Sequence, residues 1–206
     1  MIESSNRPLS LRDRTRILDD SPLHPLDKLE IAYLLLNPLK HGSFFQRSEG
    51  VGDEPPTEMQ KQAFEQEWTD IRLTLSKLRV PYIVDRPLRV DEGFYRYRII
   101  AAKKANDLQL LHDLVNAEET PEVAALSGKM MGYPATAIAS YRASDAVDVK
   151  DLPGEEVEKL RAEKLLPFVQ FALSRGHYRE ELGRVRIWQR LVRVHCPILF
   201  SELTMQ

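Results

Sequence analysis

The chain has 206 residues, enough for one sizeable hydrophobic core, and we expect a single domain over residues 1–206. Hydrophobic residues make up 43% and charged residues 29%, which is ordinary globular usage. The formal net charge of -2 argues against a dedicated polyanion binder, although it allows a local basic patch. Cys196 is the only cysteine, which excludes an intramolecular disulfide and a four-cysteine zinc site.

The sequence shows no signal for secretion or for a membrane. Residues 1–5 are not a basic segment followed by an apolar stretch, so no signal peptide is predicted. The longest apolar run, from Ile31 to Leu36, is far shorter than the roughly 20 residues that span a bilayer. We therefore expect a cytoplasmic protein without a membrane partner.

The N-terminal quarter is predicted to hold two helices and a long loop. The first 20 residues are polar, and they either form a flexible segment or hold one short helix from Leu9 to Leu18. Pro25 suits the first position of a second helix, which ends near Asn37-Pro38 because proline disfavours helix in the preceding residue. Three glycines and a proline pair predict a long exposed loop over residues 41–56.

Thr57 is expected to cap the clearest helix of the chain. The apolar residues of this helix recur at steps of 4, 3, 4 and 3, so they form one stripe with charged residues opposite. The stripe consists of Phe64, Trp68, Ile71, Leu75 and Leu78. We expect it to lie in the core.

After Arg79 the sequence is typical of strands. The segments 80–84 and 94–100 are rich in β-branched and aromatic residues, and they predict an antiparallel β-hairpin over about residues 80–101. Pro81 indicates that the first strand lies at an edge. Because a lone hairpin is marginally stable in water, it should pack on helices or pair with another strand.

The remaining sequence is typical of helices. Asn106 is a predicted N-cap, and so is Thr120, which precedes a proline at the first helical position. Gly132 is predicted to end the second of these helices in a left-handed conformation, and Tyr133-Pro134 starts another.

Asp151-Leu152-Pro153 is expected to open a further charged helix, and a last long helix is expected from His177 to Val194. Pro197 is expected to stop that last helix. The predicted fold class is therefore α+β and predominantly helical, a helix bundle with a small hairpin.

The Gly132-Tyr133-Pro134 turn is the first candidate ligand site. Backbone N–H groups at the start of the following helix, around Thr136, have no partner within that helix and can bind an anion. The alternative is a tight helical corner whose Tyr133 and Met131 fill the core. A related hypothesis places Arg175, His177 and Tyr178 in one cleft with Thr136, which would make the protein an enzyme of unrecognised type.

The residues around this turn also carry a resemblance. Residues 126–138 read Leu-Ser-Gly-Lys-Met-Met-Gly-Tyr-Pro-Ala-Thr-Ala-Ile, and residues 171–182 read Phe-Ala-Leu-Ser-Arg-Gly-His-Tyr-Arg-Glu-Glu-Leu. Both resemble a pattern in uncharacterised small bacterial and archaeal proteins, in which a leucine-glycine helix leads into Gly-Tyr-Pro and then Thr-Ala or Cys-Cys. The resemblance covers about residues 80–200 and implies kinship without an activity, since those families have no assigned function. This chain has Thr136-Ala137 in place of the cysteines, so thiol or metal chemistry is not expected there.

The sequence predicts no catalytic residue, no metal site and no cofactor. His195 and Cys196 are adjacent, but neighbours on a helix point about 100° apart, and the apolar setting favours a buried, inert thiol. His177 with Glu180 or Glu181 could form a pair, although such a group more often marks a helix N-terminus with favourable acids. The phosphate-binding glycine loops and the serine-hydrolase elbow are absent.

The last helix offers a second candidate surface, which we call the arginine ridge. It consists of Arg179, Arg186, Arg190 and Arg193, which fall within roughly 60° of one another on a helical wheel. Apolar residues flank the ridge on both sides, so we expect both flanks to be buried. The ridge could hold an acidic protein or a phosphate-bearing ligand. The alternative is a solvated face paired with acids of residues 49–70, within the chain or across a homodimer.

These observations favour a non-catalytic binding or interaction module. The alternatives are an enzyme with a polar cleft near His177 and the Gly132-Tyr133-Pro134 turn, and a weak nucleic-acid or phosphate binder that uses the arginine ridge. Fold similarity alone cannot choose between them.

Overall fold

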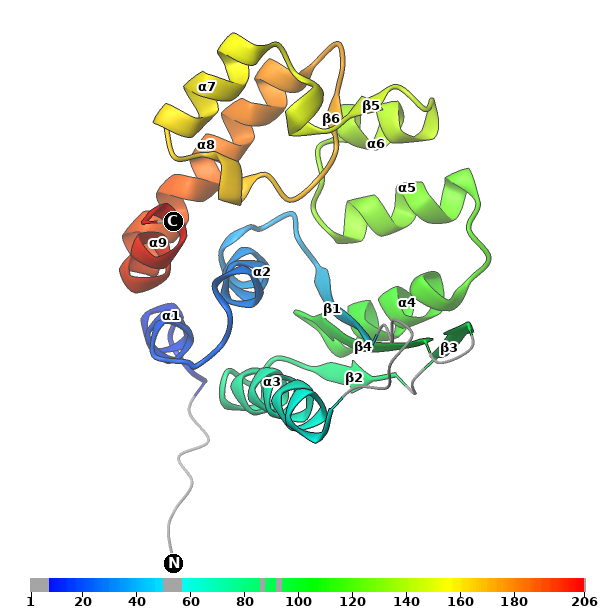
Figure 1. The fold of residues 1–206 in the computed structure, drawn as a ribbon, viewed down its shortest axis with the longest axis vertical. Coiled ribbons are helices and arrows are strands. Elements are labelled where there is room, and N and C mark those ends of the chain that lie inside the picture. The colour runs from blue at the N-terminus through cyan, green and yellow to red at the C-terminus, as the bar shows by residue number, and fades with distance from the viewer. Residues whose placement is uncertain (1–7, 50–56, 86–87, 92–93, 206) are drawn as a thin grey trace, which may run out of the picture.

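The computed structural model describes residues 8–49, 57–85, 88–91 and 94–205, and within these ranges the chain is predominantly helical with a small antiparallel sheet (Figure 1). The α-helices are α1 Leu11–Asp19, α2 Pro25–Leu36, α3 Glu58–Lys77, α4 Ala105–Asn116, α5 Pro121–Met130, α6 Ala135–Arg142, α7 Gly154–Ala162, α8 Tyr178–His195 and α9 Pro197–Thr204. The strands are β1 Gly42–Glu49, β2 Tyr82–Val84, β3 Leu88–Asp91, β4 Phe94–Ala102, β5 Ala146–Val147 and β6 Leu173–Ser174. Two short 3₁₀ helices are η1 Val149–Asp151 and η2 Leu166–Phe168. The predicted α+β class is confirmed.

β4 is the central strand of a four-stranded sheet. It pairs antiparallel with β1, β2 and β3, and β2 lies at an edge, as Pro81 indicated. The predicted hairpin partners β2 and β4 are therefore paired, and β1 supplies the additional strand.

The predicted loop over residues 41–56 is wrong for residues 42–49, which form β1, while residues 50–56 lie outside the described ranges. Ser43 and Phe45 are buried, whereas Phe44 and Gln46 are exposed, and this alternation is the period of a half-buried strand. The nearby glycines and prolines favoured a loop over a strand in the sequence-based prediction, because these residues are typical of long loops.

Different helices cover the two faces of the sheet. On one face, the Tyr97 ring of β4 lies 4.7 Å from the ring of Phe64 on α3, so the predicted α3 stripe does pack on the sheet. On the other face, Ile100 packs with Leu108 and Leu111 of α4. The sheet lies between α3 and α4 in Figure 1.

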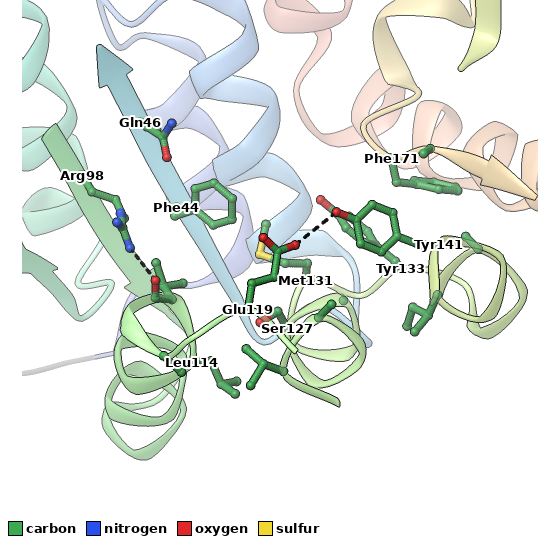
Figure 2. Close-up of a pocket in the computed structure, with 18 residues that line it drawn as sticks. Phe44, Gln46, Arg98, Leu114, Glu119, Ser127, Met131, Tyr133, Tyr141 and Phe171 are labelled. Atoms are coloured by element: carbon green, nitrogen blue, oxygen red, sulfur yellow. Dashed lines mark hydrogen bonds between the residues drawn. The ribbon is translucent and has the colours of Figure 1, made fainter. Parts of the chain in front are cut away.

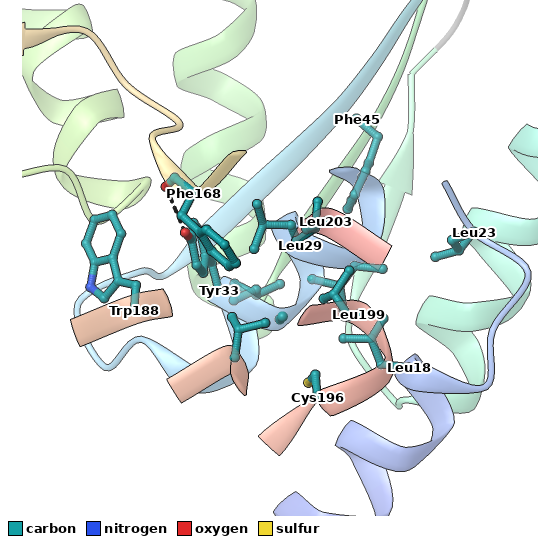
Figure 3. Close-up of a cluster of buried hydrophobic side chains, with 14 of the residues drawn as sticks. Leu18, Leu23, Leu29, Tyr33, Phe45, Phe168, Trp188, Cys196, Leu199 and Leu203 are labelled. Carbon is teal, nitrogen blue, oxygen red and sulfur yellow. Dashed lines mark hydrogen bonds between the residues drawn. The ribbon is translucent and has the colours of Figure 1, made fainter. Parts of the chain in front are cut away.

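The largest hydrophobic cluster centres on α2, which contacts α1, α8 and α9. The Tyr33 hydroxyl of α2 donates to the Phe168 carbonyl at 2.8 Å, and the Tyr33 ring lies 5.2 Å from the Trp188 ring of α8 (Figure 3). Leu18 of α1 and Leu199 of α9 complete the same cluster. One hydrophobic cluster therefore joins the first and last helices of the described chain.

Two predicted helix boundaries are corrected. Pro197 does stop the preceding helix, but it also starts α9, because the Asp19 carboxylate of α1 accepts hydrogen bonds from the first free N–H groups of α9. These bonds come from Ile198 at 3.3 Å and Leu199 at 3.0 Å. At α4, the N-cap is Lys104, which makes no side-chain capping bond, and not Asn106.

The prediction that both flanks of α8 are buried holds on one side only. Trp188 and Val192 are buried against α2, whereas Ile187 is 56% and Val194 is 68% exposed. The second flank stays open because the described helices pack against only one side of α8 here. None of the described helices has the length and apolar composition needed to cross a membrane.

Candidate functional site

The Gly132-Tyr133-Pro134 turn is a corner between α5 and α6 that packs inward. Gly132 has φ of +76°, the left-handed conformation that the sequence predicts. A Cβ at Gly132 would lie 2.9 Å from the backbone nitrogen, Cα and Cβ of Lys40. The His41 N–H also donates to the Met130 carbonyl at 2.8 Å. The turn therefore fastens the end of α5 to the segment between α2 and β1.

An internal carboxylate already lies at the start of α6. Glu181 of α8 is 1% exposed, and it accepts a hydrogen bond from the Thr136 hydroxyl at 2.5 Å. Its other oxygen accepts from the Ser174 N–H at 2.7 Å. An internal acceptor therefore already occupies the place at which an anion would meet the Thr136 hydroxyl. This geometry argues against an anion site at Thr136 and gives the residue a role in packing α6 on α8.

The other predicted ligand residues lie outside the pocket that contains Tyr133. Arg175 is exposed and pairs with Asp145 at 3.2 Å. His177 is exposed, and its ring Nδ1 lies 3.9 Å from Glu180. Tyr178 is half-buried, and the Arg179 guanidinium lies 5.5 Å from the centre of its ring. None of these three residues lines the pocket that contains Tyr133.

Two members of the arginine ridge are paired within the chain. Arg179 lies 3.1 Å from Glu156, and Arg186 lies 2.8 Å from Glu163. These acids belong to α7 and to the turn after it, and not to residues 49–70. The Arg193 guanidinium lies 5.6 Å from the centre of the Phe200 ring, and Arg190 forms no ion pair within the described ranges. Intrachain contacts thus engage most of the ridge.

An apolar pocket lies beside the sheet, between β1 and α6 (Figure 2). Its volume is about 510 Å³, which is in the range of small-ligand sites. Strands β1 and β4, helices α4, α5 and α6, and the connections between them supply its walls. The lining residues are Phe44, Gln46, Arg98, Leu114, Val115, Ala117, Glu119, Val123, Ala124, Ser127, Gly128, Met131, Tyr133, Ala137, Ile138, Tyr141, Phe171 and Ala172.

Aromatic rings form two opposite walls of the apolar pocket. Phe44 projects from β1 and is 38% exposed, although it is a large apolar side chain. On the other side, the Tyr133 and Phe171 rings lie 5.5 Å apart. At the mouth, the Tyr141 hydroxyl donates to Glu119 at 3.5 Å, and both side chains are exposed (Figure 2).

The one arginine that lines the pocket is held by neighbouring groups. Arg98 is 5% exposed, donates to the Val115 carbonyl at 3.1 Å and lies 3.7 Å from Asp85. The second carboxylate oxygen of Asp85 lies 3.1 Å from His112. Arg98 therefore joins β4 to the carbonyl end of α4, where a cation is favourable.

Tyr133 is the lining residue whose protonation the pocket determines. Burial raises the pKa of the Tyr133 phenol, and the nearby Glu30 carboxylate raises it further. The phenol consequently stays neutral over the physiological pH range and can donate a hydrogen bond, but it does not act as a base. Within the described part of the chain, its hydroxyl has no hydrogen-bond partner.

No protein-family model, no curated protein and no solved structure matches this chain. The resemblance around the Gly132-Tyr133-Pro134 turn thus stays a prediction.

Neither histidine nor cysteine lines this pocket. Across the described ranges, no three residues among histidine, cysteine, aspartate and glutamate lie close enough to hold a metal ion. Cys196 lies elsewhere, in the main core, where burial raises its thiol pKa to about 12. The groups that line the pocket instead offer apolar contacts and a few hydrogen bonds.

Of the residues predicted to bind a ligand, only Tyr133 lines the pocket. Phe44 falls in a predicted loop, and Tyr141 falls in the helix predicted after Tyr133-Pro134. Phe171 belongs to the residues that carry the resemblance, which implies no role for it. A pocket forms where separate elements pack together in the tertiary structure. The sequence patterns did not indicate that β1 and α6 lie on opposite sides of one pocket.

Proposed function

We propose that the protein is a non-catalytic binding module whose ligand places an apolar group in the pocket between β1 and α6. The observation that carries this proposal is the pocket itself, about 510 Å³ in volume and lined mainly by apolar and aromatic side chains. Burial of a large apolar side chain from water contributes about 1.5 to 3 kcal/mol, which supplies binding energy without any chemical step.

Two features of the lining support binding rather than turnover. The Tyr133 phenol stays neutral, and Arg98 is engaged by the Val115 carbonyl and Asp85. Acid–base catalysis needs a group that titrates near the working pH within reach of the reacting atom. A cytoplasmic location is also part of the proposal, supported by a single cysteine that is fully buried.

A neutral fluorescent probe, N-phenylnaphthylamine, tests the pocket. We expect its emission to rise on titration with the protein, because the probe leaves water for an apolar site. Ala124→Trp would fill the pocket from α5, since Ala124 is a half-buried lining residue. This variant should weaken probe binding at least about tenfold, which corresponds to the loss of about 1.4 kcal/mol.

The matched control is Ala139→Trp. Ala139 is exposed on α6 and does not line the pocket, so this variant makes the same substitution without filling the site. Circular dichroism should show that both variants are folded. Equal probe affinity in wild type, Ala124→Trp and Ala139→Trp would overturn the proposal, because the probe would then bind elsewhere.

A further inference from the structure

The backbone of β1 turns the N–H and C=O of Phe44 outward, on the side away from β4. The Asp85 N–H donates to the Arg98 carbonyl, so Arg98 directs its backbone groups toward β2. Backbone direction alternates along a strand, so Ile99 directs its groups toward β1. Phe45 is paired with Ile99 and therefore bonds to β4, while the preceding residue, Phe44, points its N–H and C=O away from the sheet.

These outward groups lie at a sheet edge. Within the described strands, β1 pairs only with β4, and the Phe44 N–H and C=O make no hydrogen bond to any described residue. An exposed edge of this kind is a template for another strand unless it is covered, charged or distorted. The exposed Phe44 ring makes this edge more apolar than an ordinary surface strand.

The same edge borders the apolar pocket. Figure 2 shows Phe44 and Gln46 on β1, with Tyr133, Tyr141 and Phe171 across the pocket from them. A strand added beside β1 would lie about 4.8 Å away, and its alternate side chains would point to the face on which the Phe44 ring lies. One of these side chains would enter the pocket. Strand addition with a side-chain pocket beside it is a known mode of peptide recognition.

The connection before α5, which supplies Glu119 to the pocket, indicates the charge of the added strand. Glu118 and Glu119 lie in the connection before α5 and form no ion pair with described residues, and Glu122 follows in the first turn. The one cation paired with these acids within the described ranges is Arg142, 3.3 Å from Glu122. The connection therefore leaves an excess of negative charge, which is complementary to lysine or arginine.

We propose that the partner is an extended, basic peptide segment that adds a strand to β1 and places one apolar side chain in the pocket. This inference rests on the proposed binding function and names its ligand class. The N–H and C=O of Phe44 form hydrogen bonds with the peptide backbone. The pocket selects the apolar side chain, and the acidic residues before α5 select the basic residues on either side of it.

Four synthetic heptapeptides test this inference by calorimetric titration. Each alternates lysine with apolar residues, and they differ only at the central position, which is valine, leucine, phenylalanine or tryptophan. We expect at least one to bind, and Ala124→Trp should abolish this binding. Backbone N-methylation of the tightest-binding peptide leaves its side chains unchanged and removes backbone hydrogen bonds. It should weaken peptide binding at least about tenfold, because each lost hydrogen bond lowers the affinity several-fold. Replacing its lysines with glutamate should also weaken binding.

Two variants of Phe44 test the role of the strand edge. Phe44→Pro removes the outward N–H, and proline is tolerated at an edge position whose N–H faces away from the sheet. Phe44→Val removes the same ring and keeps the N–H. We expect peptide binding to be lost in Phe44→Pro and retained in Phe44→Val, with probe affinity equal in the two variants. In the wild type, the peptide should slow hydrogen exchange at the Phe44 amide.

The outcomes separate this inference from the proposed function. Suppose that N-phenylnaphthylamine binds, that Ala124→Trp blocks its binding, and that none of the four peptides binds. The proposed binding function is then supported, and the peptide inference is overturned. The inference is also overturned if the N-methylated peptide binds as tightly as the parent, or if the Phe44 amide gains no protection. If neither probe nor peptide binds, both proposals fail.

Discussion

At the scale of single residues, Glu181 connects two separate segments through one buried carboxylate. Its oxygens accept from the Thr136 hydroxyl and from the Ser174 N–H. Glu181→Ala leaves both donors without their acceptor, and a buried polar group without a partner costs about 1 to 3 kcal/mol. We therefore expect the free energy of unfolding in urea to fall by about 2 kcal/mol or more.

The neighbouring Glu180 provides the matched control. Its side chain is exposed and lies 3.9 Å from His177, so Glu180→Ala should change stability by less than about 0.5 kcal/mol. Equal effects of the two substitutions would show that the contacts of Glu181 do not stabilise the fold.

Cys196 is a second residue whose surroundings decide its chemistry. Burial raises its thiol pKa to about 12, with a smaller contribution from Asp19. Only about one thiol in ten thousand is then ionised at about pH 8, and the thiolate is the reactive form. We expect iodoacetamide to leave the folded protein unmodified and to alkylate the urea-unfolded chain fully, as measured by intact mass. Alkylation of the folded protein at the rate of the unfolded chain would contradict this.

At the scale of helices, α9 depends on a cap from the opposite end of the chain. Asp19 accepts from the N–H groups of Ile198 and Leu199, and Lys28 pairs with Glu202 at 3.0 Å further along α9. Loss of a helix cap costs about 1 kcal/mol, so Asp19→Ala should lower the free energy of unfolding by about that amount. Hydrogen exchange should become faster at Ile198 and Leu199 first.

The pH dependence of this cap has a definite sign. Burial raises the pKa of Asp19 above its ordinary value of 3.8, and this outweighs the two hydrogen bonds that lower it. The folded chain therefore keeps this proton to a higher pH than the unfolded chain does. The resulting stabilisation is complete below the unfolded pKa and is lost as the pH rises through the folded pKa. We expect Asp19→Ala to cost more at about pH 4 than at about pH 7 in urea titrations. Equal or reversed costs would contradict this sign.

The elements that the sequence predicted well are those whose signal is local. Thr120 does cap α5, with its hydroxyl 3.3 Å from the Val123 N–H, and Gly132 does adopt the left-handed conformation at the end of that helix. In contrast, the start of α9 depends on Asp19, a residue far away in the chain. Pro197 by itself indicated only the end of the preceding helix. The pocket could not be predicted for the same reason, since only tertiary packing brings Phe44 and Tyr133 to the walls of one pocket.

At the scale of the whole molecule, the Gly132 turn connects the α4–α5 layer to the core around α2. Gly132→Ala would strain a left-handed residue and press a methyl group against the Lys40 backbone, 2.9 Å away. The left-handed conformation alone costs a residue other than glycine about 1 to 2 kcal/mol. We expect a total loss of at least about 2 kcal/mol in urea unfolding, followed by tryptophan fluorescence, with faster hydrogen exchange at the His41 amide.

Gly183 in α8 offers a control of opposite sign, because a Cβ there would meet no atom within 4 Å and the residue lies inside a helix. Alanine is favoured over glycine in a helix by about 1 kcal/mol, so Gly183→Ala should raise the free energy of unfolding. The same glycine-to-alanine change is thus expected to destabilise at the turn and stabilise in the helix. If Gly132→Ala were as stable as the wild type, the turn would be free to move away from Lys40. A turn of that kind would not hold the end of α5 against the segment between α2 and β1.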